Sequence, residues 1–109
     1  MLPRSHRVPK KSFPRVVKNG SRVYTKNFAW TIQKNDDSQT RLGIVIGKKI
    51  SKLAVTRNKI KRIVREAFQA KKTSFPYALD LICFVKQNCA KETPMDIQQE
   101  IQELIKHIN

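Results

Sequence analysis

The chain has 109 residues, a length that suits one domain with a modest hydrophobic core and leaves no room for two. Its 23 basic and 8 acidic residues give a formal net charge of +15, and self-repulsion of that size favours a polyanionic partner. The longest purely apolar run, 81–85, is too short to cross a bilayer, and the basic residues 1–18 lack the apolar segment of a secretory signal. We therefore expect a cytoplasmic protein that binds nucleic acid.

Residues 1–11 are expected to form a basic arm in front of a single RNA-binding domain, residues 12–109. The arm is predicted to be extended or mobile, and segments of this kind often order only on binding. Its cations are Arg4, Arg7, Lys10 and Lys11.

A short helix is predicted over residues 12–18, immediately after the arm. Ser12 would cap its first turn through its side chain. Gly20 would stop the helix in a left-handed conformation, which glycine adopts without steric cost. The helix would present one aromatic side chain, Phe13, on its apolar side.

Three strands are predicted next along the chain, over residues 21–25, 27–33 and 41–47. In the second strand Phe28 and Trp30 alternate with smaller residues and share one face, so we assign both to the core. In the third strand Gly43, Val45 and Gly47 share one face, and their small side chains are expected to leave a shallow surface.

The stretch from Thr56 to Gln69 predicts an amphipathic helix with an unusually cationic polar side. Its apolar positions follow helical spacing and need a core to cover them. On the adjoining arc Arg57, Lys61 and Arg65 stand at i, i+4 and i+8, and like charges at this spacing cost a few tenths of a kcal/mol per pair. Phosphate groups of a nucleic-acid backbone would offset that repulsion. A solvated helix face with no partner is the simpler alternative.

The turn before this helix contains three lysines, Lys48, Lys49 and Lys52. Backbone amides at the helix N-terminus would strengthen an anion site there. A largely buried strand is predicted over residues 79–86, and a C-terminal helix begins at Thr93. The fold class is therefore α+β, in the order α-β-β-β-α-β-α with a four-stranded sheet.

Side chains with catalytic or metal-binding potential are sparse. Cys83 lies in an apolar strand pattern and is assigned to the core, whereas Cys89 is assigned to a loop. Two cysteines do not complete a four-ligand zinc site, and no nucleophile stands in a recognisable context. We expect neither a metal site nor a catalytic residue on the protein.

A string of residues around the cationic helix carries a recognisable signature. It consists of Lys48-Lys49 after a strand, then Ala54-Val55-Thr56-Arg57-Asn58-Lys59-Ile60-Lys61-Arg62, and finally Arg65-Glu66-Ala67-Phe68. With this string, its length and its element order, the chain resembles the protein component of bacterial ribonuclease P. Lys59 is the one departure, because the family usually carries arginine there.

The resemblance implies a ribonucleoprotein in which a large catalytic RNA uses Mg²⁺ to remove the 5′ leader of precursor tRNA. The small protein would bind that RNA and carry no catalytic side chain. The family fold also contains a rare left-handed β-α-β crossover. By resemblance, the RNA-binding residues are Lys48, Lys49, Lys52, Arg57, Asn58, Lys59, Lys61, Arg62 and Arg65.

The resemblance also implies that the single-stranded leader lies in a cleft between the first helix and the sheet. The candidate leader-binding residues are Arg7, Lys10, Lys11, Phe13, Val17 and Thr31. Only Phe13 matches a family aromatic, since Val17 and Thr31 stand where relatives often present further aromatic rings. The free protein is expected to be a monomer. The alternatives are an RNA-binding structural protein, such as a small ribosomal protein, and a polycation bound to an anionic membrane.

Overall fold

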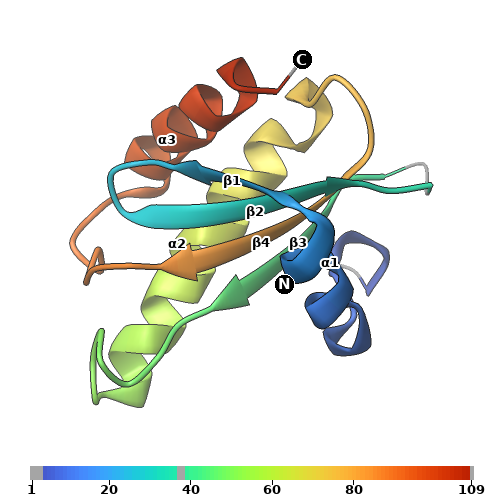
Figure 1. Cartoon of the computed structure of the whole chain (residues 1–109). Coiled ribbons are helices and arrows are strands. Elements are labelled where there is room, and N and C mark those ends of the chain that lie inside the picture. The colour runs from blue at the N-terminus through green and yellow to red at the C-terminus, as the bar shows by residue number, and fades with distance from the viewer. Residues whose placement is uncertain (1–3, 37–38, 109) are drawn as a thin grey trace.

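The computed structural model describes residues 4–36 and 39–108, in which one sheet carries helices on both faces (Figure 1). The strands are β1 (Ser21–Tyr24), β2 (Phe28–Lys34), β3 (Arg41–Val45) and β4 (Leu79–Val85). The helices are α1 (Phe13–Asn19), α2 (Ala54–Lys71) and α3 (Pro94–Lys106), with short 3-10 turns at Arg4–His6, Lys10–Ser12 and Lys72–Ser74. The predicted α+β element order is confirmed, and the cationic helix is longer at both ends than its pattern predicts.

The strand order across the sheet is β1-β2-β4-β3. β2 pairs antiparallel with both β1 and β4, whereas β3 and β4 are parallel and are joined by α2. In Figure 1 both parallel strands point to the left, β4 lies above β3, and α2 passes behind the sheet. This connection is the left-handed crossover that the resemblance implies and that general rules of chirality disfavour.

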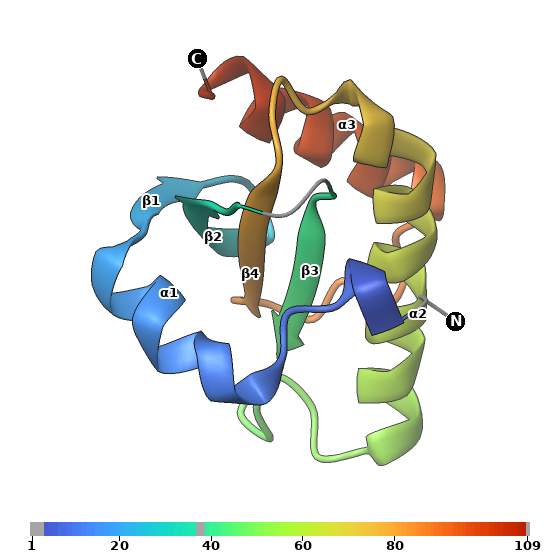
Figure 2. The same ribbon diagram turned by 90° about the vertical axis from the view of Figure 1, so that its right-hand side faces the viewer.

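The main core lies between one face of the sheet and the helices α2 and α3 (Figure 2). Phe28 and Trp30 point into it from β2, fully buried, with their ring centroids 5.3 Å apart in an edge-to-face arrangement. Their assignment to the core is confirmed. The apolar stripe of α2 is buried against the same face and comprises Ile60, Ile63, Val64, Ala67 and Phe68.

The opposite face of the sheet is only partly covered. α1 packs on it through Val16, which forms a small second cluster with Val8 and Ile82. This face, called the α1 face below, stays partly exposed, since Tyr24 and Val45 on it are 59% and 36% exposed.

Two predictions about the ends of α1 are wrong. Ser12 makes no side-chain capping bond, because its backbone is helical, with φ −90° and ψ −12°, whereas a capping residue is extended. Gly20 is extended, with φ −81° and ψ 162°, because β1 begins at the next residue. Glycine is required there for space, since a Cβ would lie 2.6 Å from the Val16 carbonyl oxygen.

Among the described residues, no helix combines the length and the apolar character needed to cross a bilayer.

Candidate nucleic-acid interface

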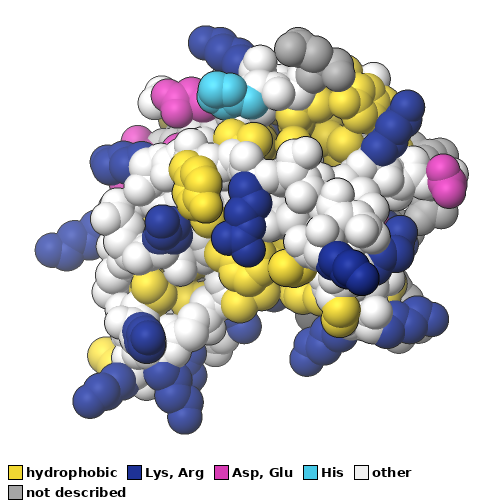
Figure 3. Space-filling view, viewed as in Figure 1, with side chains coloured by type: hydrophobic (Ala, Val, Ile, Leu, Met, Phe, Trp, Pro, Cys, Tyr) yellow, Lys and Arg dark blue, Asp and Glu magenta, His cyan; other side chains and the backbone are white. Residues whose placement is uncertain are grey.

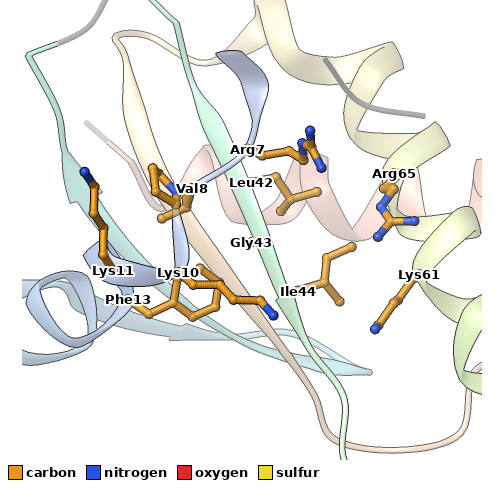
Figure 4. Close-up of a pocket in the computed structure, with 11 residues that line it drawn as sticks. Arg7, Val8, Lys10, Lys11, Phe13, Leu42, Gly43, Ile44, Lys61 and Arg65 are labelled. Carbon is orange, nitrogen blue, oxygen red and sulfur yellow. The ribbon is translucent and has the colours of Figure 1, made fainter. Parts of the chain in front are cut away.

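A cationic groove of about 590 Å³ runs over β3 between the N-terminal segment and α2 (Figure 4). β3 is an edge strand, and its residues Leu42, Gly43 and Ile44 form the groove floor. The other lining residues are Arg7, Val8, Pro9, Lys10, Lys11, Phe13, Lys61 and Arg65. Five of the lining side chains are cationic and none is acidic, so the groove attracts anions.

One wall of the groove depends on contact between Phe13 and Gly43. A Cβ placed on Gly43 would lie 2.5 Å from Cζ of the Phe13 ring, well inside van der Waals contact. The ring therefore rests directly on the backbone of β3, at a position that only glycine leaves open. The small residue at Gly43 thus leaves room that the Phe13 ring fills, and β3 ends at Val45, before Gly47.

The N-terminal segment is held against β3 before α1 begins. The Val8 amide donates to the Leu42 carbonyl at 3.0 Å, and Arg7 forms a parallel bridge to the same residue. Val8 is 5% exposed and belongs to the second hydrophobic cluster. In the arm, predicted to be extended or mobile, residues 7–11 line the groove, and 3-10 turns occupy Arg4–His6 and Lys10–Ser12. The remaining residues of that arm, 1–3, lie outside the described residues.

α2 supplies the other wall. Lys61 and Arg65 project from it toward the Phe13 side of the groove, as Figure 4 shows. Arg57, one turn before Lys61, instead donates from Nη1 to the Ser51 carbonyl at 2.8 Å. Arg57 therefore braces the lysine-rich turn that precedes the helix, in addition to facing solvent.

The comparison with known protein families decides the identity of the chain. The family model described as Ribonuclease P matches residues 2–109. This chain belongs to the ribonuclease P protein family. A ribonuclease P protein component from Syntrophus aciditrophicus is 34% identical over 105 residues, which are 95% of this chain and 87% of that relative.

Solved structures of the family have the same fold. The ribonuclease P protein from Thermotoga maritima superposes with a TM-score of 0.82 at 27% identity, covering 94% of this chain and 97% of that one. A ribonuclease P protein from Staphylococcus aureus gives a TM-score of 0.78 at 33% identity, with 93% of each chain covered. The resemblance inferred from the central motif is confirmed, and the alternative of a small ribosomal protein is not favoured.

The other RNA-binding residues implied by the family lie around the N-terminal half of α2. Lys48, Lys49 and Lys52 are exposed in the turn before the helix. Asn58, Lys59 and Arg62 are exposed on the helix and do not line the groove. The implied set therefore divides into a groove wall, Lys61 with Arg65, and an outer surface that surrounds the helix N-terminus.

Only some of the candidate leader-binding residues line the groove. Arg7, Lys10, Lys11 and Phe13 all line the groove. Val17 is 36% exposed on α1 but lies outside the lining. Thr31 is only 1% exposed and packs against Gly20, so its side chain is buried beneath the surface that a leader would meet.

Five residues that line the groove were not among the candidate site residues predicted from the sequence: Val8, Pro9, Leu42, Gly43 and Ile44. Leu42 and Ile44 are apolar residues on the core-facing side of β3, and their pattern indicates only burial. Val8 is a single apolar residue in a basic segment, and nothing in its neighbours signals that it docks on a strand edge.

The two cysteines lie away from the groove and are both buried and unpaired. Burial raises the pKa of the Cys83 thiol well above its usual range, and it raises the pKa of Cys89 to about 11. Both thiols are therefore protonated at neutral pH and are poor nucleophiles. The assignment of Cys83 to the core is confirmed, and Cys89 occupies a loop as predicted, although it is buried there.

Proposed function

We propose that the groove of this ribonuclease P protein holds the single-stranded 5′ leader of precursor tRNA and that the outer surface of α2 binds the catalytic RNA. The supporting observation is the groove itself, whose walls combine Phe13 with five cations and no acid. Phosphates would contact Arg7, Lys10, Lys11, Lys61 and Arg65. An aromatic ring beside them offers a stacking surface for a base, as in other single-strand binding proteins.

Cleavage of the tRNA precursor is assigned to the RNA subunit, with Mg²⁺ bound by that RNA. The described residues contain no group of three or more His, Cys, Asp and Glu side chains that could hold a metal ion, so we propose no metal ligand on the protein. The protein would act by neutralising repulsion between two RNAs and by positioning the leader. Neutralisation also lowers the Mg²⁺ concentration that the RNA needs.

The partners proposed for this chain are the ribonuclease P catalytic RNA and precursor tRNA. We place the protein in the cytoplasm and propose that it is a monomer when free of RNA. The net charge of +15 supports this, because two such chains repel each other without a polyanion between them.

Reconstitution tests the proposal. Purified protein is added to ribonuclease P catalytic RNA and a 5′-extended precursor tRNA at low Mg²⁺ concentration, and release of the leader is measured. We expect strong stimulation by the wild-type protein. No stimulation by a protein that is folded, as judged by circular dichroism, would overturn the assignment.

A matched pair of variants separates the groove from charge in general. Lys10→Glu with Lys61→Glu places two acids in the groove, whereas Lys91→Glu with Lys106→Glu makes the same charge change at exposed positions outside it. We expect the first pair to abolish stimulation and the second to retain most of it. Equal losses would mean that the protein acts as an unspecific polycation.

A further inference from the structure

A second pocket, of about 430 Å³, lies where β3 begins, between that strand and the connection from α2 to β4. Its polar lining includes His6, Thr40 and Lys72, and its apolar lining includes Phe75, Tyr77 and Ala78. It shares no lining residue with the cationic groove. The second pocket is therefore a separate site, although His6 stands next to Arg7 of the groove in the chain.

Hydrogen bonds hold the walls of the second pocket in place. The Thr40 side chain accepts from the Leu79 amide at 3.3 Å and donates to the Tyr77 carbonyl at 3.5 Å. The Asn35 amide donates to the Ala78 carbonyl at 3.1 Å. These bonds tie the connection into β4 to the end of β2 and the start of β3. The pocket is therefore preformed, as small-molecule sites usually are.

Two aromatic rings give the second pocket an apolar side. Phe75 is 9% exposed, and its ring centroid lies 6.3 Å from that of Phe68, so this side continues into the main core. Tyr77 is half-buried, and the ammonium of Lys34 lies 5.0 Å from the centroid of its ring. Figure 3, which views the α1 face, shows hydrophobic side chains at the upper right, where Figure 1 places the connection from α2 to β4, with a lysine or arginine side chain beside them. A flat apolar ring can pack here beside a cation.

The polar side of the second pocket lacks a counter-ion. Lys72 is half-buried and forms no ion pair with an acid of the described residues, and none of the described lining residues is acidic. Nδ1 of His6 is buried and has no hydrogen-bond partner within residues 4–36 and 39–108. Buried polar atoms are rarely left unpaired, and a ligand oxygen is the kind of partner that this nitrogen lacks. The carbonyls at the C-terminus of α2 repel anions, so Lys72 and His6 decide whether an anion enters.

These two sides select a ligand that is apolar and anionic at once. The volume lies within the range of roughly 300 to 1,000 Å³ that small-molecule sites occupy. Inorganic phosphate alone would leave both rings uncovered, and an uncharged aromatic compound would leave Lys72 without an anion. A nucleoside monophosphate carries both parts, because its base stacks on an aromatic ring and its phosphate pairs with cationic side chains.

We propose that the second pocket binds one nucleoside monophosphate, with the base against Tyr77 and Phe75 and the phosphate on Lys72 and His6. The nucleotide is either free or the phosphorylated end of an RNA chain. This site goes beyond the proposed function, because neither the groove nor the outer surface of α2 takes part in it.

Isothermal titration calorimetry of the 109-residue chain with AMP tests the proposal. We expect one AMP to bind, and adenosine and inorganic phosphate to bind at least about 10-fold more weakly. Lys72→Ala should weaken AMP binding by about 10- to 100-fold, the effect of losing a hydrogen bond between charged groups. Tyr77→Leu should weaken AMP binding by about 5- to 150-fold, as for loss of a stacking ring, and should leave phosphate binding unchanged.

The net charge of +15 attracts any anion, so the experiment needs a matched control. Lys106→Ala removes the same charge from an exposed position on α3 and should bind AMP like wild type. Nuclear magnetic resonance of the wild-type protein provides a measurement without any substitution. AMP should shift the ring nitrogens of His6 and the backbone amides of Lys72 and Tyr77, and should leave those of Lys61 and Arg65 in the groove unshifted.

Several results would overturn the proposal. They are no binding of AMP at millimolar concentration, equal binding of AMP and inorganic phosphate, a loss in Lys106→Ala as large as in Lys72→Ala, or shifts confined to the groove. An RNA trinucleotide with a 5′ phosphate then identifies the source of the ligand. If it displaces AMP, the second pocket takes the end of an RNA chain, and if it does not, the pocket takes the free nucleotide.

Discussion

The guanidinium of Arg41 donates from Nε and Nη2 to the two carboxylate oxygens of Asp80, both at 2.7 Å. The two residues are register partners on the parallel strands β3 and β4, and Asp80 is completely buried. The same carboxylate accepts a bond from Asn35 at 2.9 Å and a longer one from Arg15 of α1 at 3.5 Å. One buried acid thus ties α1 and the edge strand β3 together beside the groove.

Asp80→Asn should destabilise the fold strongly. The Arg41 side chain is only 16% exposed, and replacing the buried carboxylate with an amide removes the counter-charge of its two 2.7 Å bonds, a loss of about 3 to 5 kcal/mol for a buried pair. Urea denaturation measures this change in the free energy of unfolding. Glu103→Gln makes the same change of charge on an exposed residue of α3 and should have little effect. Similar urea midpoints for both variants would show that the Arg41–Asp80 pair makes no net contribution to the free energy of unfolding.

Gly43→Ala should weaken leader binding by displacing the Phe13 ring. The added Cβ would lie 2.5 Å from the ring, so the ring must move off β3 and lose its position in the groove. We expect a loss of about 5- to 150-fold in affinity for precursor tRNA relative to mature tRNA, as for loss of one stacking aromatic. Gly47→Ala is the matched control, because its nearest atom would be 4.0 Å away. A leader effect as large at Gly47 would refute the role of the ring.

Arg65→Ala should lower the salt dependence of RNA binding by about one phosphate contact. The slope of log affinity against log salt would then become shallower by about 0.7 to 0.9. Arg57→Ala should have the same effect, and it should also loosen the lysine turn, since the bond to the Ser51 carbonyl is lost. Filter binding over a range of salt concentrations measures the slopes. Lys106→Ala, exposed on α3, should leave the slope unchanged, and unchanged slopes in all three variants would place the phosphate contacts elsewhere.

Asp96 should make α3 sensitive to acid. Its carboxylate accepts hydrogen bonds from the backbone and side chain of Thr93, the helix cap, and these bonds lower its pKa in the folded state. A lowered folded pKa stabilises the protein above the unfolded value, about 3.9, and that contribution is lost as pH falls through the folded pKa. Asp96→Asn should therefore be less stable than wild type at neutral pH, and the difference should shrink as pH falls below the unfolded pKa. Thermal melts across that range test this, and a constant difference between the two proteins would contradict it.

Local patterns in the sequence predicted the elements and the faces of those elements. The alternation of Phe28 and Trp30 predicted a buried side of β2, and helical spacing predicted both the buried stripe and the cationic arc of α2. The motif from Lys48 to Phe68 predicted the family. These features depend on neighbours within a few residues, so periodicity and turn chemistry were sufficient to find them.

The groove was decided by tertiary structure. Arg7 and Arg65 come together because the N-terminal segment pairs with edge strand β3 and the crossover helix returns along the same strand. Periodicity states which face of an element a residue occupies, but contacts between distant segments depend on strand order and crossover hand, and no local pattern of residues encodes either of them.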